Sequence, residues 1–383
     1  MITATMLQDT SNVSSWNTTN AGSASNTVVI PTSSTGTYGC TVDWGDGTTS
    51  NISTYNDPSW THVYGSTGTY NIKIYGTFNG IVFDALGDKL KILSVSKWGC
   101  NFRLGTTQGT YYDGCANLTV TATDALILNG TTSLASCFTS CTSLSNVPNI
   151  NLWDVSNVTS LASIFSGAAL FNQSLNSWNT GNVSTMNSVF SNATAYNQSL
   201  SNWNVSNVTT MNSMFRGTTY NQSLSSWNVS KVANFGSTFS RSSSGAGANP
   251  SISGWNTSSA TNMSGFAQNN TTFNQTSISS FVTSSVTNMS SMFNGATSAN
   301  PDVHTWNIGA LTNATTMFTS SGFTETNYNL LLDSGVGWPS QATIQSGVVF
   351  SAGSAHYSGT NAINGRATLT STYTWTITDG GTP

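Results

Sequence analysis

Side chains able to do chemistry are few in this 383-residue chain, and they lie far apart in its sequence. The chain has one glutamate and three histidines: Glu325, His62, His304 and His356. No Asp or Glu lies between Asp154 and Asp302, so this region cannot supply the paired carboxylates of glycoside hydrolysis. A Ser-His-Asp triad there could use only His304 with Asp302, an unusual pair because the two are sequence neighbours. We therefore expect no enzymatic activity and no catalytic or cofactor-binding residue.

A second candidate for chemistry is the glycine turn between Asp43 and Asp46. Their carboxylate oxygens could help to hold a Ca²⁺ ion. Alternatively, the two side chains accept hydrogen bonds from nearby backbone amides, as Asp commonly does in turns. We favour the turn and expect no metal site.

Residues that could contact a ligand lie at variable positions in the middle of the chain. One segment there is lengthened by Arg241 to Asn249, a Ser- and Gly-rich insertion. Insertions in repeat proteins map to loops on one face, so this one is a plausible contact loop. We predict ligand contacts at six positions: Arg216, Lys231, Arg241, Ser243, Gln268 and Asn269.

The elements that must position these residues are repeats with a period of about 25 residues. A tryptophan slot recurs at Trp153, Trp178, Trp203, Trp227, Trp255, Phe281 and Trp306. A closing aromatic recurs at Phe165, Phe190, Phe215, Phe239, Phe266, Phe293 and Phe318. Such a period indicates a solenoid, in which each coil buries its apolar residues against its neighbours. The aromatic slots follow this periodicity, so we expect them to be core rather than a sugar-stacking row.

Each coil is predicted to hold one strand and one helical turn. Trp203 to Val208 suits an extended segment, and Met211, Met214 and Phe215 have the spacing of one helix face. An Asn follows most of the slot tryptophans, and stacked amides can bond the backbone of the next coil. We therefore predict a structural ladder of Trp178, Asn179, Trp203, Asn204, Trp227, Asn228, Trp255, Asn256, Trp306 and Asn307.

The first 80 residues alternate short apolar runs with turns, as in a small β-sandwich. The run Val42 to Gly47, followed by His62-Val63-Tyr64 and Gly68 to Ile74, resembles the signature of PKD-like immunoglobulin-type domains. The resemblance implies that its Trp, His and Tyr residues are core and turn elements.

The repeat unit Phe-Asn-Gln-x-Leu-x-x-Trp-Asn-x-x-x-Val-x-x-Met-x-x-x-Phe resembles the BspA-like repeats of bacterial and phage surface proteins. These repeats are a divergent branch of the leucine-rich-repeat class. The resemblance implies surface display and adhesion, or receptor binding in phage-encoded members, and no catalytic residues. One departure is systematic, because only Trp153-Asp154 keeps the acid that the family has after its Trp.

Composition excludes two classes of partner. Only 6% of residues are charged, the net charge is -4, and no basic stripe could neutralise phosphates, so nucleic-acid binding is not expected. No stretch of about 20 apolar residues could span a membrane. The start, Met1 to Asp9, lacks the basic and apolar regions of a secretory signal, which favours direct assembly onto a particle.

The expected fold is mainly β, in four parts. These are a PKD-like β-sandwich (1–80), irregular opening coils (81–150), a regular BspA-like, leucine-rich-repeat-like solenoid (151–323) and a small α/β cap (324–383). The expected function is non-enzymatic adhesion, receptor binding or decoration on a phage virion surface. The expected partners are a host-surface glycan or protein receptor and, through the amino-terminal domain, other virion or envelope proteins. The alternatives are a bacterial cell-surface adhesin, a purely structural shell or filament component and, more distantly, a polysaccharide depolymerase.

Overall fold

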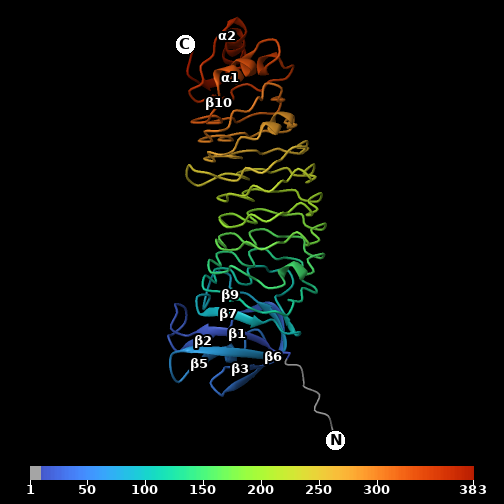
Figure 1. The fold of residues 1–383 in the computed structure, drawn as a ribbon, viewed down its shortest axis with the longest axis vertical. Coiled ribbons are helices and arrows are strands. Elements are labelled where there is room, and N and C mark those ends of the chain that lie inside the picture. The colour runs from blue at the N-terminus through green and yellow to red at the C-terminus, as the bar shows by residue number, and fades with distance from the viewer. Residues whose placement is uncertain (1–9) are drawn as a thin grey trace. The chain divides into compact units, whose positions relative to one another are not determined.

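The computed structural model describes residues 10–383, which are mainly β with a few short helices. Residues 1–9, where the sequence shows no secretory signal, lie outside the described residues. The chain divides into two compact units, Met1–Asn179 and Thr180–Pro383. In Figure 1 the colours run from blue to green in the first unit and from green to red in the second.

The first unit contains a seven-stranded sheet with the order β4-β3-β6-β1-β7-β9, and β8 pairs with β6. The strands β2 and β5 form a separate two-stranded sheet. Their bounds are β1 Asn12–Asn17, β2 Thr27–Val29, β3 Thr32–Asp43, β4 Thr49–Ile52, β5 Thr61–Val63, β6 Thr69–Ile81, β7 Ile92–Lys97, β8 Phe102–Arg103 and β9 Thr119–Val120. The short apolar runs expected in the first 80 residues lie in strands, as β2, β3 and β6 show. The sheet continues through β7 and β9, beyond residue 80.

Alternation along the strands explains the core of this unit. In β1 every second residue is buried, and its Trp16 stacks on Phe83 with ring centroids 5.9 Å apart. Successive side chains of a strand point to opposite faces, so one face of β1 packs inward while the other meets solvent.

A buried ion pair joins the loops at the edge of this core. Lys91 Nζ donates to the carbonyl oxygens of Ser23, Ala24 and Thr27 and lies 3.8 Å from an oxygen of Asp88. The Lys91 and Asp88 side chains are 0% and 1% exposed. The sequence alone does not predict this buried pair, because most of the hydrogen bonds that hold Lys91 come from the backbone of a distant loop.

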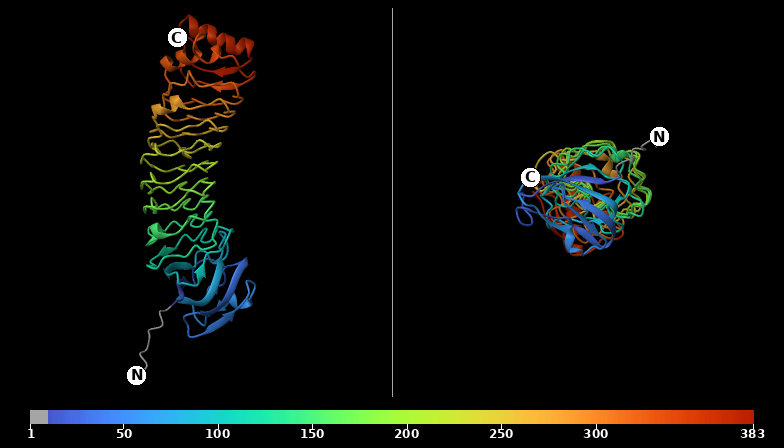
Figure 2. Two further views of the ribbon diagram at one scale, coloured as in Figure 1. Left: turned by 90° about the vertical axis from the view of Figure 1, so that its right-hand side faces the viewer. Right: turned by 90° about the horizontal axis from the view of Figure 1, so that it is seen from below.

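The predicted strand and helical turn of each repeat are wrong in detail. Between β9 and β10 (Val349–Ser351) the described residues form turns, three short 3₁₀ segments (Ile150–Leu152, Thr276–Ser280 and Trp338–Ser340), the helix α1 (Glu325–Leu332) and isolated parallel bridges between repeats. One column of bridges in the second unit runs through Thr185, Thr210, Asn234, Asn262, Asn288 and Asn313. Figures 1 and 2 show the corresponding turns of chain lying one on another within this unit.

The segment expected to be helical is not a helix, because its backbone amides alternate between two kinds of hydrogen-bond partner. The amides of Met211, Ser213 and Phe215 donate to carbonyls of the next repeat, at Asn234, Gly236 and Thr238. The amides of Met214 and Arg216 instead donate three residues back within their own repeat. Every second amide therefore pairs as in a parallel sheet, and the others close turns.

A left-handed residue in this segment prevents a continuous helix. Ser213 has φ 57°, and Ser163, Ser188, Ser237, Ser291 and Thr316 have similar values at the equivalent positions of other repeats. A residue with a Cβ in this conformation costs about 1 kcal/mol, which the hydrogen bonds to the neighbouring repeat offset. The spacing of apolar residues gave no sign of this reversal of φ.

Tryptophans of the predicted ladder bond between repeats, whereas four of its asparagines form turns within one repeat. The indole Nε1 atoms of Trp178, Trp227, Trp255 and Trp306 each donate to a carbonyl of the preceding repeat, at distances of 2.8 to 3.1 Å. Rings of neighbouring slots also stack, as Trp203 and Trp227 do with centroids 6.5 Å apart.

Asn204, Asn228, Asn256 and Asn307 instead use their side-chain oxygens locally. Each accepts from the backbone amide two residues further along, which is an Asx turn. These four side chains are exposed and therefore close turns within one repeat. An amide contact between repeats lies elsewhere, from Asn262 Nδ2 to Asn234 Oδ1 at 3.0 Å.

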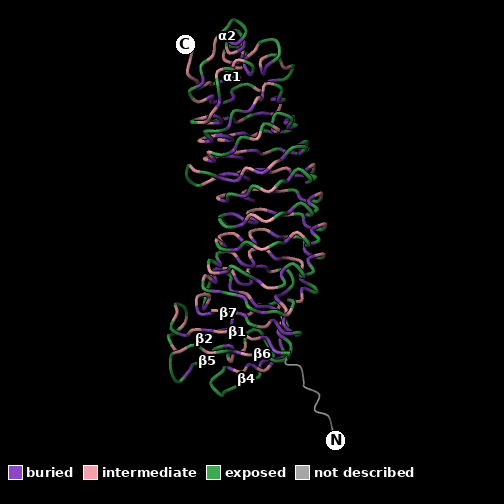
Figure 3. Tube along the Cα trace, in the orientation of Figure 1, coloured by how far each residue is buried: buried purple, intermediate pink, exposed green. Residues whose placement is uncertain are grey.

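The core of the repeats is aromatic and aliphatic, as the periodicity predicts. Phe165, Phe190, Phe215, Phe239, Phe266, Phe293 and Phe318 are all buried, and so are the slot residues. Figure 3 shows buried and exposed residues alternating along each turn of the chain.

The second unit ends in a small α/β region with α1 (Glu325–Leu332), β10, α2 (Thr360–Ala367) and β11 (Thr376–Thr378). The helix α2 continues as a π turn, Thr368–Thr372. The strands β10 and β11 pair in parallel, and Phe350 of β10 bridges to Ala314 of the last repeat. Within residues 10–383, no helix has the length and apolar character needed to cross a bilayer.

Candidate functional site

The Asp43–Asp46 turn is held by its own hydrogen bonds. Asp43 accepts from the Gly45 amide, and Asp46 accepts from the amide and hydroxyl of Thr48. The second oxygen of Asp46 lies 2.8 Å from His62 Nε2. The carboxylates thus serve the turn, and among residues 10–383 no group of three acidic, His or Cys side chains could hold a metal ion.

Aromatic packing behind this turn supports the structural role predicted for its neighbours. The His62 ring stacks on Trp44 at 4.7 Å and meets the Tyr64 ring edge-on at 4.4 Å. Trp44 and Tyr64 are buried, and the Tyr64 hydroxyl donates to the Trp44 carbonyl.

The Asp46–His62 contact predicts a specific acid sensitivity. Burial alone would raise the pKa of Asp46, but hydrogen bonds from Thr48 and His62 outweigh it and lower this pKa to about 2. A depressed folded-state pKa stabilises the fold above the ordinary value of 3.8, and this contribution is lost as pH falls towards 2. We expect the melting temperature of Asp46→Asn to fall less steeply than that of wild type between pH 4 and pH 2. If the melting temperatures of wild type and Asp46→Asn fell in parallel between pH 4 and pH 2, the Asp46 carboxylate would not contribute to this acid sensitivity.

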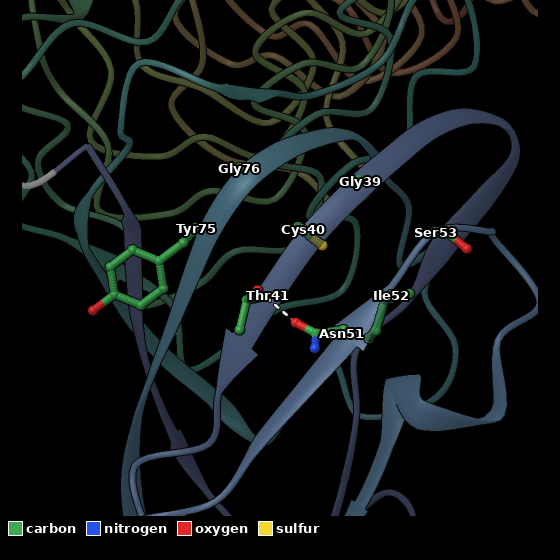
Figure 4. Close-up of a pocket in the computed structure, with 8 residues that line it drawn as sticks. All are labelled: Gly39, Cys40, Thr41, Asn51, Ile52, Ser53, Tyr75 and Gly76. Carbon is green, nitrogen blue, oxygen red and sulfur yellow. Dashed lines mark hydrogen bonds between the residues drawn. The ribbon is translucent and has the colours of Figure 1, made fainter.

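A shallow hollow of about 580 Å³ lies on the β4-β3-β6 part of the sheet (Figure 4). Its lining includes Thr41, Asn51 and Tyr75, which occupy directly paired positions on three neighbouring strands. Thr41 Oγ1 donates to Asn51 Oδ1 at 2.7 Å. Cys40 also lines the hollow, and burial raises the pKa of its thiol to about 11, which favours the protonated thiol over the reactive thiolate at neutral pH.

The Asp302–His304 pair forms at the end of the repeats. His304 Nδ1 and Asp302 Oδ1 are 2.6 Å apart. Within the described residues, no hydrogen bond joins His304 to a serine or threonine hydroxyl. The geometry therefore provides an imidazole oriented by Asp302, and a triad would further need a hydroxyl bonded to that imidazole.

Four of the six predicted contact residues come together on one edge of the second unit. The Gly217 amide, next to Arg216, donates to the Ser240 carbonyl, and the Arg241 amide donates to the Gln268 carbonyl. Asn269 Nδ2 lies 3.4 Å from the Arg241 carbonyl. We call Arg216, Arg241, Gln268 and Asn269 the arginine edge.

The other two predicted residues do not belong to this group. Lys231 is exposed, and its Nζ donates to Asn207 Oδ1 of the preceding repeat at 2.8 Å. Ser243 is exposed in the insertion, at the stretch Ser242–Ser244.

The insertion is docked on the repeat that follows it. Gly245 bridges to Asn270, and Asn249 exchanges side-chain hydrogen bonds with Asn274 and Gln275. Gly247 is required there, because a Cβ at this position would lie 2.5 Å from the Asn270 side chain. The loop beside the arginine edge is therefore fixed by hydrogen bonds on both of its flanks.

Asn270 is the residue that the sequence reasoning missed. It is fully buried, and its Nδ2 donates to the carbonyls of Phe239 and Ala248 at 2.9 and 2.7 Å. Its Oδ1 accepts from Thr272. The equivalent position holds alanine in several repeats, so an amide at an apolar position was the available signal.

The arginine edge is electropositive for a simple reason. Sequence positions 155–301 contain no carboxylate side chain, so Arg216 and Arg241 have no acid among these repeats to pair with. Arg241 Nε is buried and has no hydrogen-bond partner within residues 10–383. A guanidinium offers directed N–H donors and no acceptor, so this edge suits oxygen-rich ligands.

The chain is poor in charge, and parallel bridges stack its repeats on one another. Residues 132–247 and 242–330 match the family described as Mycoplasma protein of unknown function, DUF285. These ranges cover more than half of the chain, so the chain belongs to this family. Comparison with curated proteins found no match, and comparison with solved structures found none either.

Proposed function

We propose that this chain is a non-enzymatic recognition protein that binds a receptor outside a particle or cell. The arginine edge carries the proposal, because it places two arginines without acidic partners beside two amides and a docked insertion. Hydrogen bonds between repeats fix the backbone at this edge, so binding would not have to order the backbone there.

The finer fold assignment belongs to the same proposal. The parallel bridges between repeats support a leucine-rich-repeat-like solenoid of the BspA type. The buried Trp44 and the His62–Tyr64 contact support a PKD-like, immunoglobulin-type sheet domain before it. Both architectures mostly serve binding and display, which agrees with recognition rather than catalysis.

The ligand is a glycan or protein receptor that supplies acceptor oxygens. Hydrogen bonds and shape would dominate, since the chain has only 9 Lys and Arg residues and a net charge of -4. Electrostatic steering would contribute little, so the affinity would change little between low and high salt.

Substitution of the arginines tests the edge. We expect the double variant Arg216→Ala/Arg241→Ala to bind intact cells at least about tenfold more weakly, because it removes both guanidiniums and their hydrogen bonds to the receptor. Flow cytometry with the labelled full chain measures this. Lys231→Ala is the matched control, since it removes a cation away from the edge and should bind as wild type does. Equal weakening by the control would assign the effect to net charge instead.

Display on a phage virion is the favoured location, and a bacterial cell surface is the alternative. The resemblance to BspA-like repeats of phage and bacterial surface proteins supports both. Attachment to other virion or envelope proteins would then fall to the amino-terminal sheet domain. Antibody labelling of intact particles and intact cells, viewed by electron microscopy, separates the two locations.

A structural role is the second candidate, and the backbone bonds between repeats favour it. Alternate amides of a repeat pair with the next one, as Met211, Ser213 and Phe215 do. Such a stack would stiffen a shell or filament without binding a host ligand. This role would be supported if antibody against the chain labelled intact particles while the purified chain bound no cell.

A further inference from the structure

We propose that the carboxyl-terminal region holds a second binding site, a pocket for one neutral sugar residue between α1 and the start of α2. The pocket has a volume of about 520 Å³, and its lining includes Asn329, Leu330, Asp333, Ser358 and Asn361. It is separate from the arginine edge, and none of its residues was singled out from the sequence.

One wall of the pocket is a hydrogen-bonded network. The Ser358 hydroxyl donates to Glu325 Oε1 at 2.6 Å, and the Ser358 amide donates to Asn329 Oδ1 at 2.9 Å. Asn329 Nδ2 lies 3.4 Å from the Ser358 hydroxyl. These bonds hold the loop before α2 against α1 and fix the orientation of the Asn329 amide.

A second group in the lining is a carboxylate paired with an amide. Asn361 Nδ2 donates to Asp333 Oδ2 at 3.0 Å, and the Gly335 amide donates to Asp333 Oδ1 at 2.7 Å. The amide of Gly335 and the side chain of Asn361 lower the pKa of Asp333, so it is a carboxylate at neutral pH. Asn361 keeps an acceptor oxygen and a further N–H that can meet a ligand.

Apolar surface completes the site. Leu330 is 36% exposed although it is a large hydrophobic residue, and Ala362 lies in the lining beside it. The two helices pack closely beneath, because a Cβ at Gly365 would lie 1.7 Å from the Leu332 carbonyl oxygen. The pocket is therefore built on a packed base.

This combination selects a neutral sugar over other ligands. A sugar hydroxyl donates and accepts at once, which matches Asp333 beside the Asn361 and Asn329 amides. The C–H face of the ring would lie on Leu330. An anion would be repelled by Asp333 and Glu325, and within residues 10–383 no group of three ligating side chains could hold a metal ion.

The test uses the full chain and methyl glycosides of glucose, galactose, mannose and N-acetylglucosamine. Saturation-transfer difference NMR detects binding, and titration calorimetry gives the dissociation constant of the best ligand. We expect Asp333→Ala and Asn361→Ala each to weaken that binding at least about tenfold. Asn364→Ala, an exposed position of α2 outside the pocket, is the matched control and should bind as wild type does.

The outcomes are distinct from those of the receptor test. Asp333, Asn361 and Asn364 are surface positions, so circular dichroism should show all three variants folded. Binding of none of the four glycosides would overturn the proposal. So would unchanged binding by both pocket variants, or equal weakening by the control. The Arg216→Ala/Arg241→Ala variant should keep full sugar binding, which separates this site from the arginine edge.

Discussion

Trp227→Ala is expected to destabilise the second unit by about 3–5 kcal/mol, among the largest single losses in the chain. The side chain is 2% exposed and contacts Trp203 and Phe215 at centroid distances of 6.5 and 6.3 Å. Its Nε1 donates to the Leu200 carbonyl of the preceding repeat at 3.0 Å. The substitution therefore removes core volume, ring stacking and a bond between repeats together. Urea denaturation followed by circular dichroism measures the loss.

The neighbouring asparagine provides the control. Asn228 is exposed, and its side-chain oxygen accepts a hydrogen bond from the Ser230 amide of the same turn. We expect Asn228→Ala to cost about 1 kcal/mol or less, because one solvent-accessible hydrogen bond is lost. If Asn228→Ala cost as much as Trp227→Ala, asparagine rather than tryptophan would join the repeats.

Lys91→Met is expected to destabilise the first unit by about 3–5 kcal/mol. The substitution leaves the Asp88 carboxylate buried without its cation, and the carbonyls of Ser23, Ala24 and Thr27 lose a donor. A lone buried charge is far costlier than a paired one, which is why the loss exceeds that of a surface salt bridge. Thermal and urea unfolding of the variant measure it.

A surface lysine and a double variant complete this test. Lys73→Met, at a partly exposed position of β6, should change stability by about 0.5 kcal/mol or less. Lys91→Met/Asp88→Leu should recover only part of the loss, because the amides of Ser23 and Val29 also bond Asp88. A loss below about 1 kcal/mol for Lys91→Met would contradict the structural role of the pair.

The slot residues show how far sequence periodicity reaches. The positions of Trp203, Trp227 and Phe215 in the core follow from a repeat that buries its apolar residues against neighbours. The path of the backbone between them does not follow. Ser213 is left-handed, and this turns a spacing that suits a helix into alternating turns and bridges. Hydrogen bonds to the next repeat stabilise the turns and bridges over a helix. The sequence of a single repeat does not reveal these bonds.

The candidate sites divide in the same way. Arg216 and Arg241 stand out in sequence as cations in a region without acids, and their closeness depends on the register between repeats. Asn270 holds the insertion from a buried position, which follows only once the loop is seen docked. The pocket that contains Asp333 and Asn361 forms only where α1 packs against α2, so no local sequence motif predicts it.

Binding of the full chain to intact bacterial cells, combined with sizing of their surface polysaccharide, tests the central claim most directly. A non-enzymatic recognition protein should bind saturably, with little change between low and high salt, and should leave the polysaccharide at its original length. Absence of saturable binding across a broad panel of cells, or shortening of the polysaccharide by the purified chain, would contradict the account.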